Sequence, residues 1–287
     1  MNCVATQQSS LRHWLASIQL RLQQRAGSTR VVSSRHQGPL RVQRPFYPER
    51  SDCCHVYLLH PPGGMVIGDE LTISAELDSN ASGLITTPSA GKVYGAKGAA
   101  FSQRQTIEFH LAENSTLEWL PQETIVFNTA NAELKTRVNL AAGARYFGWD
   151  IVRLGRIASG ETFQQGYCEQ RLEVYCDNKP LLIERNRVVA GEPLQSGVYG
   201  LQGRNTFATL VATCQPGRDA IDKLCETLDG MSPAADCWGL TQKGSLFIAR
   251  YLGDDVALCR RGFEYIWRYL RPLFNGNEAV PPRIWRT

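Results

Sequence analysis

The segment LLHPPGGMVIGDEL, residues 58–71, brings together residue types that could do chemistry. An apolar run ends at His60, and two acidic residues, Asp69 and Glu70, follow nine and ten positions later. An imidazole close to carboxylates could bind a metal or act as a general acid–base pair. The same letters also describe a stiff turn between two strands, so the segment has a chemical and a structural interpretation.

The structural interpretation accounts for the H-P-P-G-G motif on its own. Two prolines lack the N–H groups that a sheet ladder needs, and two glycines permit positive φ in a sharp reversal. His55 lies five positions before His60, which on a strand places the two imidazoles on opposite faces. One metal is therefore not expected to bind both. The residues of this structural motif are His60, Pro61, Pro62, Gly63 and Gly64.

The usual catalytic signatures are absent from the sequence. It contains no G-x-x-x-x-G-K-[ST], no G-x-S-x-G and no H-E-x-x-H. The nine cysteines show no C-x-x-C spacing, and their odd number argues against a secreted disulfide framework. A Cys–His pair can still form in three dimensions, so a hydrolase on a β scaffold, using a Cys–His or a carboxylate pair, remains an alternative.

Charge is distributed unevenly along the chain. Residues 1–50 hold eight arginines and one acid, whereas residues 51–259 carry a net charge of −7. A basic N-terminal stretch makes nucleic-acid binding a second alternative. Against it, Trp14 shares an alternating pattern with Ala16 and Ile18, which predicts a buried tryptophan rather than an exposed stacking platform. No run of about 18 apolar residues is present, and no secretory signal, so we expect a cytosolic protein without a membrane span.

Hydrophobic periodicity indicates a mostly-β chain. Apolar residues alternate with polar ones over residues 14–22, 71–77, 107–111 and 133–140, and a turn at Asp177–Pro180 separates two further strands. Helical spacing occurs over 217–230, where Gly230 can end the helix, and over 254–272, where Pro272 is expected to stop it. We therefore predict a single domain over residues 1–287, with 1–12 disordered, made of many short strands in a β-helix-like or two-sheet stack with about two α-helices near the C-terminus.

Several longer motifs indicate a family. They are GPLRVQRPFYPE, HPPGGMVIGDEL, LITTPSAGKVY, EWLPQETIVF, GRIASGETFQQG, RYLRPLFNG and PRIWRT. In this order, from about residue 38 to 287, they resemble segments of the urease accessory protein D family, also called H. One departure is Met65–Gly68, which stands where a more glycine-rich link is expected.

The resemblance implies a role and not a reaction. Proteins of this family bind apo-urease together with accessory proteins F and G in the cytosol, where the G protein is a GTPase that delivers nickel. The family member is thought to offer an internal, water-filled passage for the metal. For this chain the resemblance implies a non-catalytic scaffold with no permanently bound cofactor, nickel(II) in transit, and neither a nucleic-acid nor a membrane partner.

The composition suits a conduit better than a store. Tight nickel binding favours several imidazole or thiolate ligands, and only five scattered histidines are present. A passage needs weak oxygen ligands, and interior carboxylates reduce the cost of moving a dication through a low-dielectric interior. The positions that match the family's passage are Asp69, Thr86, Thr87, Asp150 and Glu184.

Each of these positions also has a structural alternative. Asp69 could cap a turn, and Asp150 could bond a nearby backbone N–H. Thr86 and Thr87 could serve as β-formers before a proline. Glu184 shares strand parity with Leu182 and is expected either to point inward or to lie on an edge strand.

Overall fold

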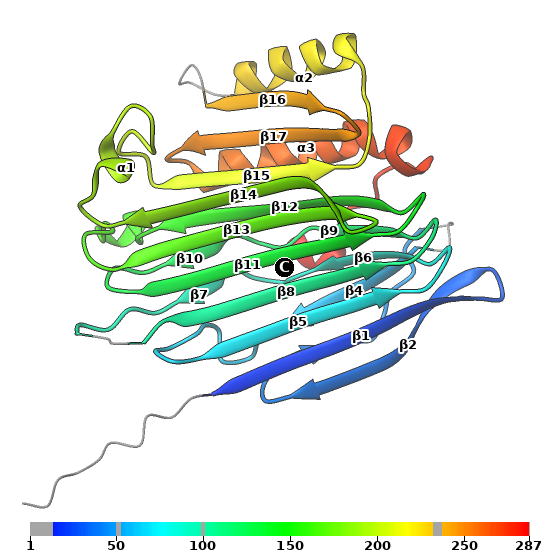
Figure 1. Cartoon of the computed structure of the whole chain (residues 1–287), viewed down its shortest axis with the longest axis horizontal. Helices are drawn as coiled ribbons and strands as arrows, with labels where there is room; N and C mark the ends of the chain where they lie inside the picture. The colour runs from blue at the N-terminus through cyan, green and yellow to red at the C-terminus, as the bar shows by residue number, and fades with distance from the viewer. Residues whose placement is uncertain (1–13, 50–52, 99–100, 232–236, 287) are drawn as a thin grey trace, which may run out of the picture.

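Strands dominate the structure and form two stacked sheets, with two long helices behind one of them (Figure 1). The computed structural model describes residues 14–49, 53–98, 101–231 and 237–286. The segment 1–12, for which we predicted disorder, lies outside the described residues. The prediction of a mostly-β fold in a two-sheet stack is confirmed.

The first sheet has seven strands. Their spatial order is β14 (Lys179–Val189), β13 (Tyr167–Cys176), β11 (Asn131–Leu140), β8 (Gln103–Leu111), β5 (Glu70–Leu77), β1 (Leu15–Arg25) and β2 (Ser28–Gln37). The five central strands, from β13 to β1, pair in parallel, and each edge strand is antiparallel to its neighbour. The turn between β13 and β14 consists of Asp177 and Asn178, which both adopt positive φ as such residues tolerate.

The second sheet has ten strands. Eight of them follow the order β16 (Trp238–Lys243), β17 (Leu246–Gly253), β15 (Thr206–Ala212), β12 (Arg145–Leu154), β9 (Thr116–Trp119), β6 (Ser82–Thr86), β4 (Cys54–Leu59) and β3 (Arg41–Val42). The other two, β10 (Thr124–Val126) and β7 (Gly91–Val93), pair with each other, and β10 also pairs with β12. From β4 to β13 the chain passes repeatedly between the sheets, which gives the winding of a β-helix.

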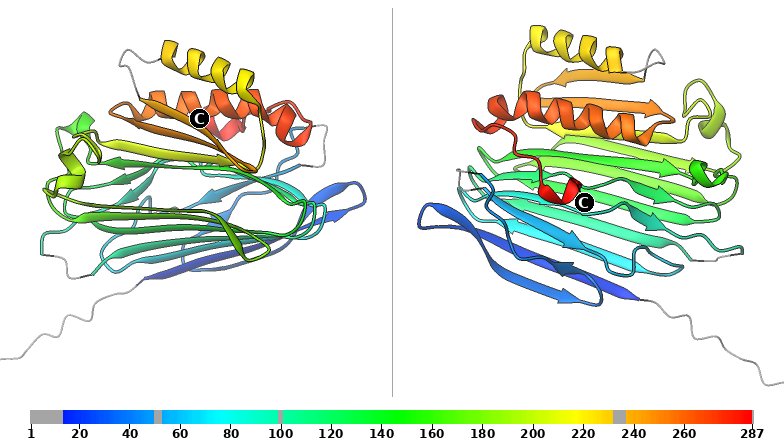
Figure 2. Two further views of the ribbon diagram at one scale, coloured as in Figure 1. Left: turned by 45° about the horizontal axis from the view of Figure 1, so that its top comes forward. Right: turned by 180° about the vertical axis from the view of Figure 1, so that it is seen from behind.

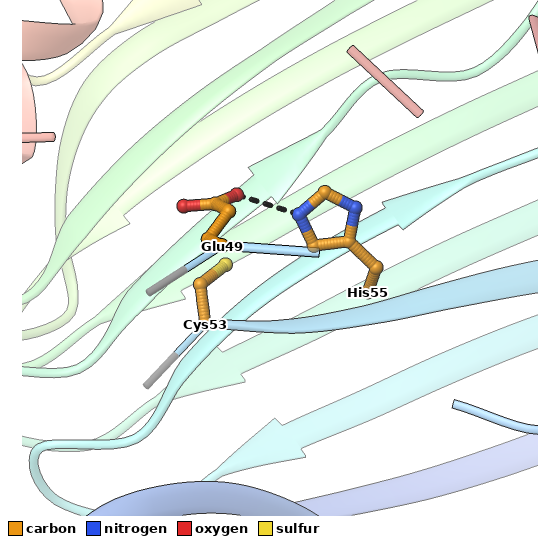
Figure 3. A group of neighbouring side chains, drawn as sticks. All are labelled: Glu49, Cys53 and His55. Atoms are coloured by element: carbon orange, nitrogen blue, oxygen red, sulfur yellow. Dashed lines mark hydrogen bonds and ion pairs between the residues drawn. The ribbon is translucent and has the colours of Figure 1, made fainter. Parts of the chain in front are cut away.

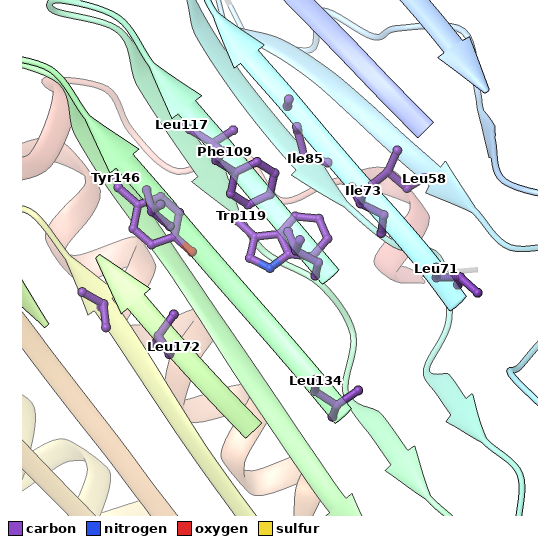
Figure 4. Packing of buried hydrophobic residues seen from close by; sticks show 14 of the residues in the cluster. Leu58, Leu71, Ile73, Ile85, Phe109, Leu117, Trp119, Leu134, Tyr146 and Leu172 are labelled. Carbon is purple, nitrogen blue, oxygen red and sulfur yellow. The ribbon is translucent and has the colours of Figure 1, made fainter. Parts of the chain in front are cut away.

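The main core fills the space between the two sheets. Alternation places Ile73 of β5 and Phe109 of β8 on the inner face of the first sheet, while Ile85 and Trp119 point inward from the second (Figure 4). The rings of Phe109 and Trp119 meet across the interface with centroids 5.4 Å apart. Burial of these side chains holds the sheets together, because removing apolar surface from water stabilises the fold.

A second core lies between the other face of the second sheet and two helices, α2 (Arg218–Met231) and α3 (Val256–Asn275). Seen from behind, α3 lies across this face and the C-terminal η2 (Arg283–Arg286) follows it (Figure 2). Strand β12 is consequently buried on both sides. Phe147 and Trp149 face the helices, whereas Tyr146 and Val152 face the first sheet.

Two short helical segments complete the fold. They are η1 (Ile157–Ser159) and α1 (Pro193–Ser196).

Three local predictions were wrong. Trp14 is 50% exposed and precedes β1, whereas Ala16 and Ile18, which share its strand parity, are buried. Helix α2 continues through Gly230 to Met231. Helix α3 includes Pro272 and ends at Asn275, where Gly276 adopts the left-handed conformation and donates its N–H to the Pro272 carbonyl.

Candidate functional site

Two adjoining cavities lie between the sheets. The first, of about 70 Å³, has a mixed wall, in which the polar side chains of Thr87, Thr136, Asp150 and Gln170 lie among apolar ones such as Ile73. The second, of about 80 Å³, extends toward the H-P-P-G-G turn and includes His60 in its wall. Thr87 belongs to the wall of both, so the two cavities are neighbours. Space of this size with polar walls can hold water.

Asp150 is the carboxylate of the first cavity. Strand parity directs it toward the first sheet, between Gly148 and Val152, and it retains some accessible surface because it lines the cavity. Burial raises the pKa of Asp150 to about 6. Hydrogen bonding from Thr136 and Gln170 opposes this shift, and the negative charge of Glu184 adds to it. The titration midpoint of this carboxylate therefore lies about one unit below neutral pH, and the group is mainly ionised at pH 7.

The polar residues of the first cavity are followed by Glu184 on β14. Its side chain is 13% exposed and accepts a hydrogen bond from the Thr209 hydroxyl at 2.6 Å. The Asn186 amide bridges it to Gln170, donating to the Gln170 carbonyl at 2.9 Å and to Glu184 at 3.4 Å. Glu184 therefore lies on the inward-facing side of an edge strand, and both parts of the expectation for this residue are met.

The two adjacent threonines point to opposite faces of the second sheet. The Thr87 hydroxyl accepts from the Gln122 N–H at 2.9 Å and faces the cavities. The Thr86 hydroxyl donates to the Leu120 carbonyl at 2.5 Å and accepts from the Trp285 indole N–H at 2.8 Å. Of this pair, the structure places only Thr87 in the wall of the cavities described above.

Asp69 combines a structural contact with an unused oxygen. One carboxylate oxygen accepts from the Val66 N–H at 2.8 Å and caps the turn. The other, Oδ1, is buried and has no hydrogen-bond partner within the described parts of the chain. Burial raises the pKa of Asp69, while the nearby His60 lowers it. Asp69 thus belongs to the same end of the interior as His60, although it does not line either cavity directly.

The H-P-P-G-G segment forms the turn that its composition predicts. The Gly63 N–H donates to the His60 carbonyl at 2.8 Å, and Gly63 adopts a φ of +76°. A Cβ on Gly64 would lie 2.8 Å from the Lys92 carbonyl oxygen. The motif therefore closes one wall of the second cavity, and only His60 among its residues offers a side chain with donor or acceptor atoms to the interior.

A separate group on the other face of the second sheet consists of Glu49, Cys53 and His55 (Figure 3). One potential ligand atom from each lies within 4.8 Å of the other two. The Glu49 carboxylate is already engaged by His55 Nε2 at 2.6 Å and by Arg271 Nη2 at 2.8 Å. A metal bound here would have to displace a buried guanidinium from its partner.

The same group bears on the hydrolase alternative, because it brings a thiol near an imidazole. Burial raises the pKa of Cys53 well above its usual value, and the negative charges of Glu118 and Glu49 add to the shift. A protonated thiol is a poor nucleophile. None of the cavities described above is lined by this group, so the arrangement does not favour nucleophilic catalysis.

Arg271 makes this group part of a buried ion network. Its guanidinium also donates to Glu118 of β9, at 2.8 Å from Nη2 and 2.9 Å from Nε. Both Arg271 and Glu118 have fully buried side chains. The network joins the segment before β4 to helix α3, and we assign it a structural role.

Comparison with known proteins places the chain in a family. The sequence profile described as UreD urease accessory protein matches residues 15–286. A Urease accessory protein UreD from Saccharophagus degradans is 58% identical over 278 residues, covering 96% of this chain and 94% of the relative. The proteins of the same name from Klebsiella aerogenes and Pseudomonas fluorescens are 44% and 43% identical, each over 96% of this chain and over 97% and 95% of their own lengths.

The chain belongs to the UreD family. Membership supports a role in urease maturation. Within the described residues of this UreD chain, neither long helix offers an apolar stretch of the length that a bilayer crossing requires.

Several polar residues of the UreD interior were missed by sequence reasoning. They are Thr136, Gln170, Asn186, Thr209 and Arg250. Thr136 and Gln170 interrupt an otherwise apolar strand parity, between Leu134 and Val138 and between Cys168 and Leu172, and Asn186 follows Glu184 on the face that begins with Leu182 and ends with Val188. A polar residue that interrupts an apolar alternation was the signal that could have identified them.

Proposed function

We propose that this chain is a non-catalytic scaffold of urease maturation that acts in the cytosol. It binds apo-urease together with accessory proteins F and G, and it passes nickel(II) through the space between its two sheets. Nickel is cargo in this scheme and not a resident cofactor. The family assignment supports the maturation role, and the interior polar residues support the passage.

The main observation in support of a nickel passage is the position of Asp150. A carboxylate that lines a cavity between two mostly apolar sheet faces lowers the stability of the fold unless it is paired with another group or binds a cation, because burial disfavours its charged form. A dication passing the site would stabilise the charged form and displace the proton.

The ligands around this carboxylate suit transit. Among the described residues, the polar side chains in the wall of the first cavity offer hydroxyl, amide and carboxylate oxygens and include no cysteine or histidine. Oxygen donors hold Ni²⁺ more weakly than imidazole or thiolate donors, so the ion would leave each position rapidly. The polar series Thr87, Asp150, Gln170, Asn186 and Glu184 would provide successive positions of this kind.

The test is urease activation by the Asp150→Asn variant under limiting nickel. The amide keeps the shape of the side chain and removes its negative charge. Apo-urease would be incubated with F, G and the variant, and urease activity and bound nickel would be followed with time. We expect activation to slow about tenfold, which corresponds to ~1.4 kcal/mol, while co-purification of the chain with F, G and urease is unchanged.

A matched control is Glu108→Gln. Glu108 lies on β8 with 42% of its side chain exposed, beside His110. This substitution also replaces a carboxylate by its amide, but outside the interior, and should leave activation at the wild-type rate. Wild-type activation by Asp150→Asn at limiting nickel would refute the passage, and failure of the wild-type chain to co-purify with F, G or urease would refute the scaffold.

A further inference from the structure

Arg250 on β17 of the second sheet forms an ion pair with the carboxylate of Glu184 on β14 of the first sheet. Its Nε and Nη2 atoms lie 3.0 and 2.5 Å from Glu184 Oε2, and the other oxygen, Oε1, accepts from Thr209. Both carboxylate oxygens are therefore in use. Glu184 is 13% exposed and Arg250 47%, so the guanidinium lies on the solvent side of the pair.

Sheet register places Arg250 in line with the interior acids. Asp150, Thr209 and Arg250 are direct cross-strand partners on β12, β15 and β17. Directly opposed residues in a sheet share one face, so these side chains all project toward the first sheet. The row leads from the first cavity outward, and Arg250 is its last charged member.

Space is available for the guanidinium to move. The cross-strand partner of Arg250 on β16 is Gly239, and a Cβ placed there would meet no atom of the described residues within 4 Å. Arg250, Gly239 and Glu184 line a solvent-open depression of about 380 Å³. A flexible arginine stem can rotate into that space without displacing the sheet.

A guanidinium and a dication compete for a carboxylate. Arginine stays protonated at all accessible pH values, so only movement of the side chain can free Glu184. While it remains in place, its positive charge also repels a second cation at short range. Glu184, Thr209 and Asn186 would otherwise present a carboxylate, a hydroxyl and an amide to a passing ion.

We propose that Arg250 masks a divalent-cation site formed by Glu184, Thr209 and Asn186 at the outer end of the interior polar series. The site opens when the guanidinium rotates toward Gly239. This inference rests on the proposed function, since it assigns to the passage a point at which release of the metal is controlled. It concerns the isolated chain, so it can be tested without urease.

The experiment measures binding of Ni²⁺ alone to the purified full-length chain by equilibrium dialysis at constant ionic strength. Arg250→Gln removes the masking charge, and we expect it to bind Ni²⁺ at least about tenfold more tightly than the wild type. The gain should disappear in the Arg250→Gln/Glu184→Gln double variant. Arg250→Met, which keeps much of the apolar stem, should show the same gain and serves if the glutamine variant folds poorly.

The matched control is Arg204→Gln. Arg204 is 41% exposed, close to the 47% of Arg250, and pairs at 2.8 Å with Asp254, which is 46% exposed, so the substitution removes the same charge from a surface ion pair. It should change nickel affinity less than twofold. Equal affinity of wild type, Arg250→Gln and Arg250→Met would overturn the proposal, as would a gain that persists without Glu184. Neither result would affect the scaffold role, which co-purification with F, G and urease tests, or the passage at Asp150, which the activation assay with Asp150→Asn tests.

Discussion

Arg271 of helix α3 and Glu118 of strand β9 are 153 positions apart in the sequence, yet Nη2 of the arginine lies 2.8 Å from Oε1 of the glutamate in a fully buried pair. Replacing Arg271 by Ala would leave Glu118 and Glu49 buried without their shared cation. Breaking a buried pair in this way typically costs about 3–5 kcal/mol. We expect Arg271→Ala to lower the free energy of unfolding by that amount in urea denaturation at pH 7.

The control for this prediction is Arg261→Ala on the same helix. Arg261 is 62% exposed and lies 4.0 Å from Asp255, a surface pair of little energetic weight. Its removal should change the free energy of unfolding by less than about 1 kcal/mol. Similar losses in the two variants would contradict a structural role for the buried network.

The Trp285 indole ties the C-terminal η2 to the second sheet. Its N–H donates to the Thr86 hydroxyl at 2.8 Å, and its ring lies 5.8 Å from that of Trp267. Trp285→Phe should retain much of the ring contact and lose the hydrogen bond, at a cost of about 1 kcal/mol. A double-mutant cycle with Thr86→Val, followed by urea denaturation, should show that the two losses are not additive. Additive losses would mean that the bond contributes nothing to holding this segment.

Asp150 should make stability depend on pH in the acid range. Because its pKa is about 6 in the folded chain and near 3.8 when unfolded, the folded state binds the extra proton between these values. Stability contributed by this group is therefore full below pH 3.8 and falls as pH rises through 6. Asp150→Asn should raise the free energy of unfolding at pH 7.5, by up to roughly 3 kcal/mol, and change it little near pH 4. A mutant-minus-wild-type difference that is constant from pH 4 to 7.5 would contradict the raised pKa.

The strands and their inward-facing residues were accessible from the sequence because alternation is a local signal. Leu71, Ile73, Ala75 and Leu77 lie on the buried face of β5, as their spacing predicts. The end of helix α3 was not accessible in this way. Pro272 removes one N–H, but packing of Leu270 and Phe274 against the second sheet continues the helix to Asn275.

The site was predictable in part. Motif resemblance pointed to Asp69, Thr86, Thr87, Asp150 and Glu184, of which Thr87 and Asp150 line the first cavity, but the contacts of Glu184 with Thr209 and Arg250 depend on the distance between two sheets. The pattern of residues along a single strand gives no information about the distance between the two sheets. The opposite orientations of Thr86 and Thr87 follow from strand parity, although parity alone does not say which face meets the helices.

These two threonines provide a paired test of the passage. Thr87→Val removes a hydroxyl that accepts one backbone N–H and should cost about 1 kcal/mol, whereas Thr86→Val removes a hydroxyl with two hydrogen bonds, to the Leu120 carbonyl and from the Trp285 indole, and should cost about 2 kcal/mol. Only Thr87 lines the interior cavities. We therefore expect Thr87→Val to slow urease activation several-fold at limiting nickel and Thr86→Val to leave the rate near that of the wild type. Because the loss concerns a metal-facing oxygen, excess nickel should restore much of the rate of Thr87→Val. Equal rates for the two variants, compared at equal concentrations of folded chain, would show that nickel does not pass along the face of the second sheet to which Thr87 points.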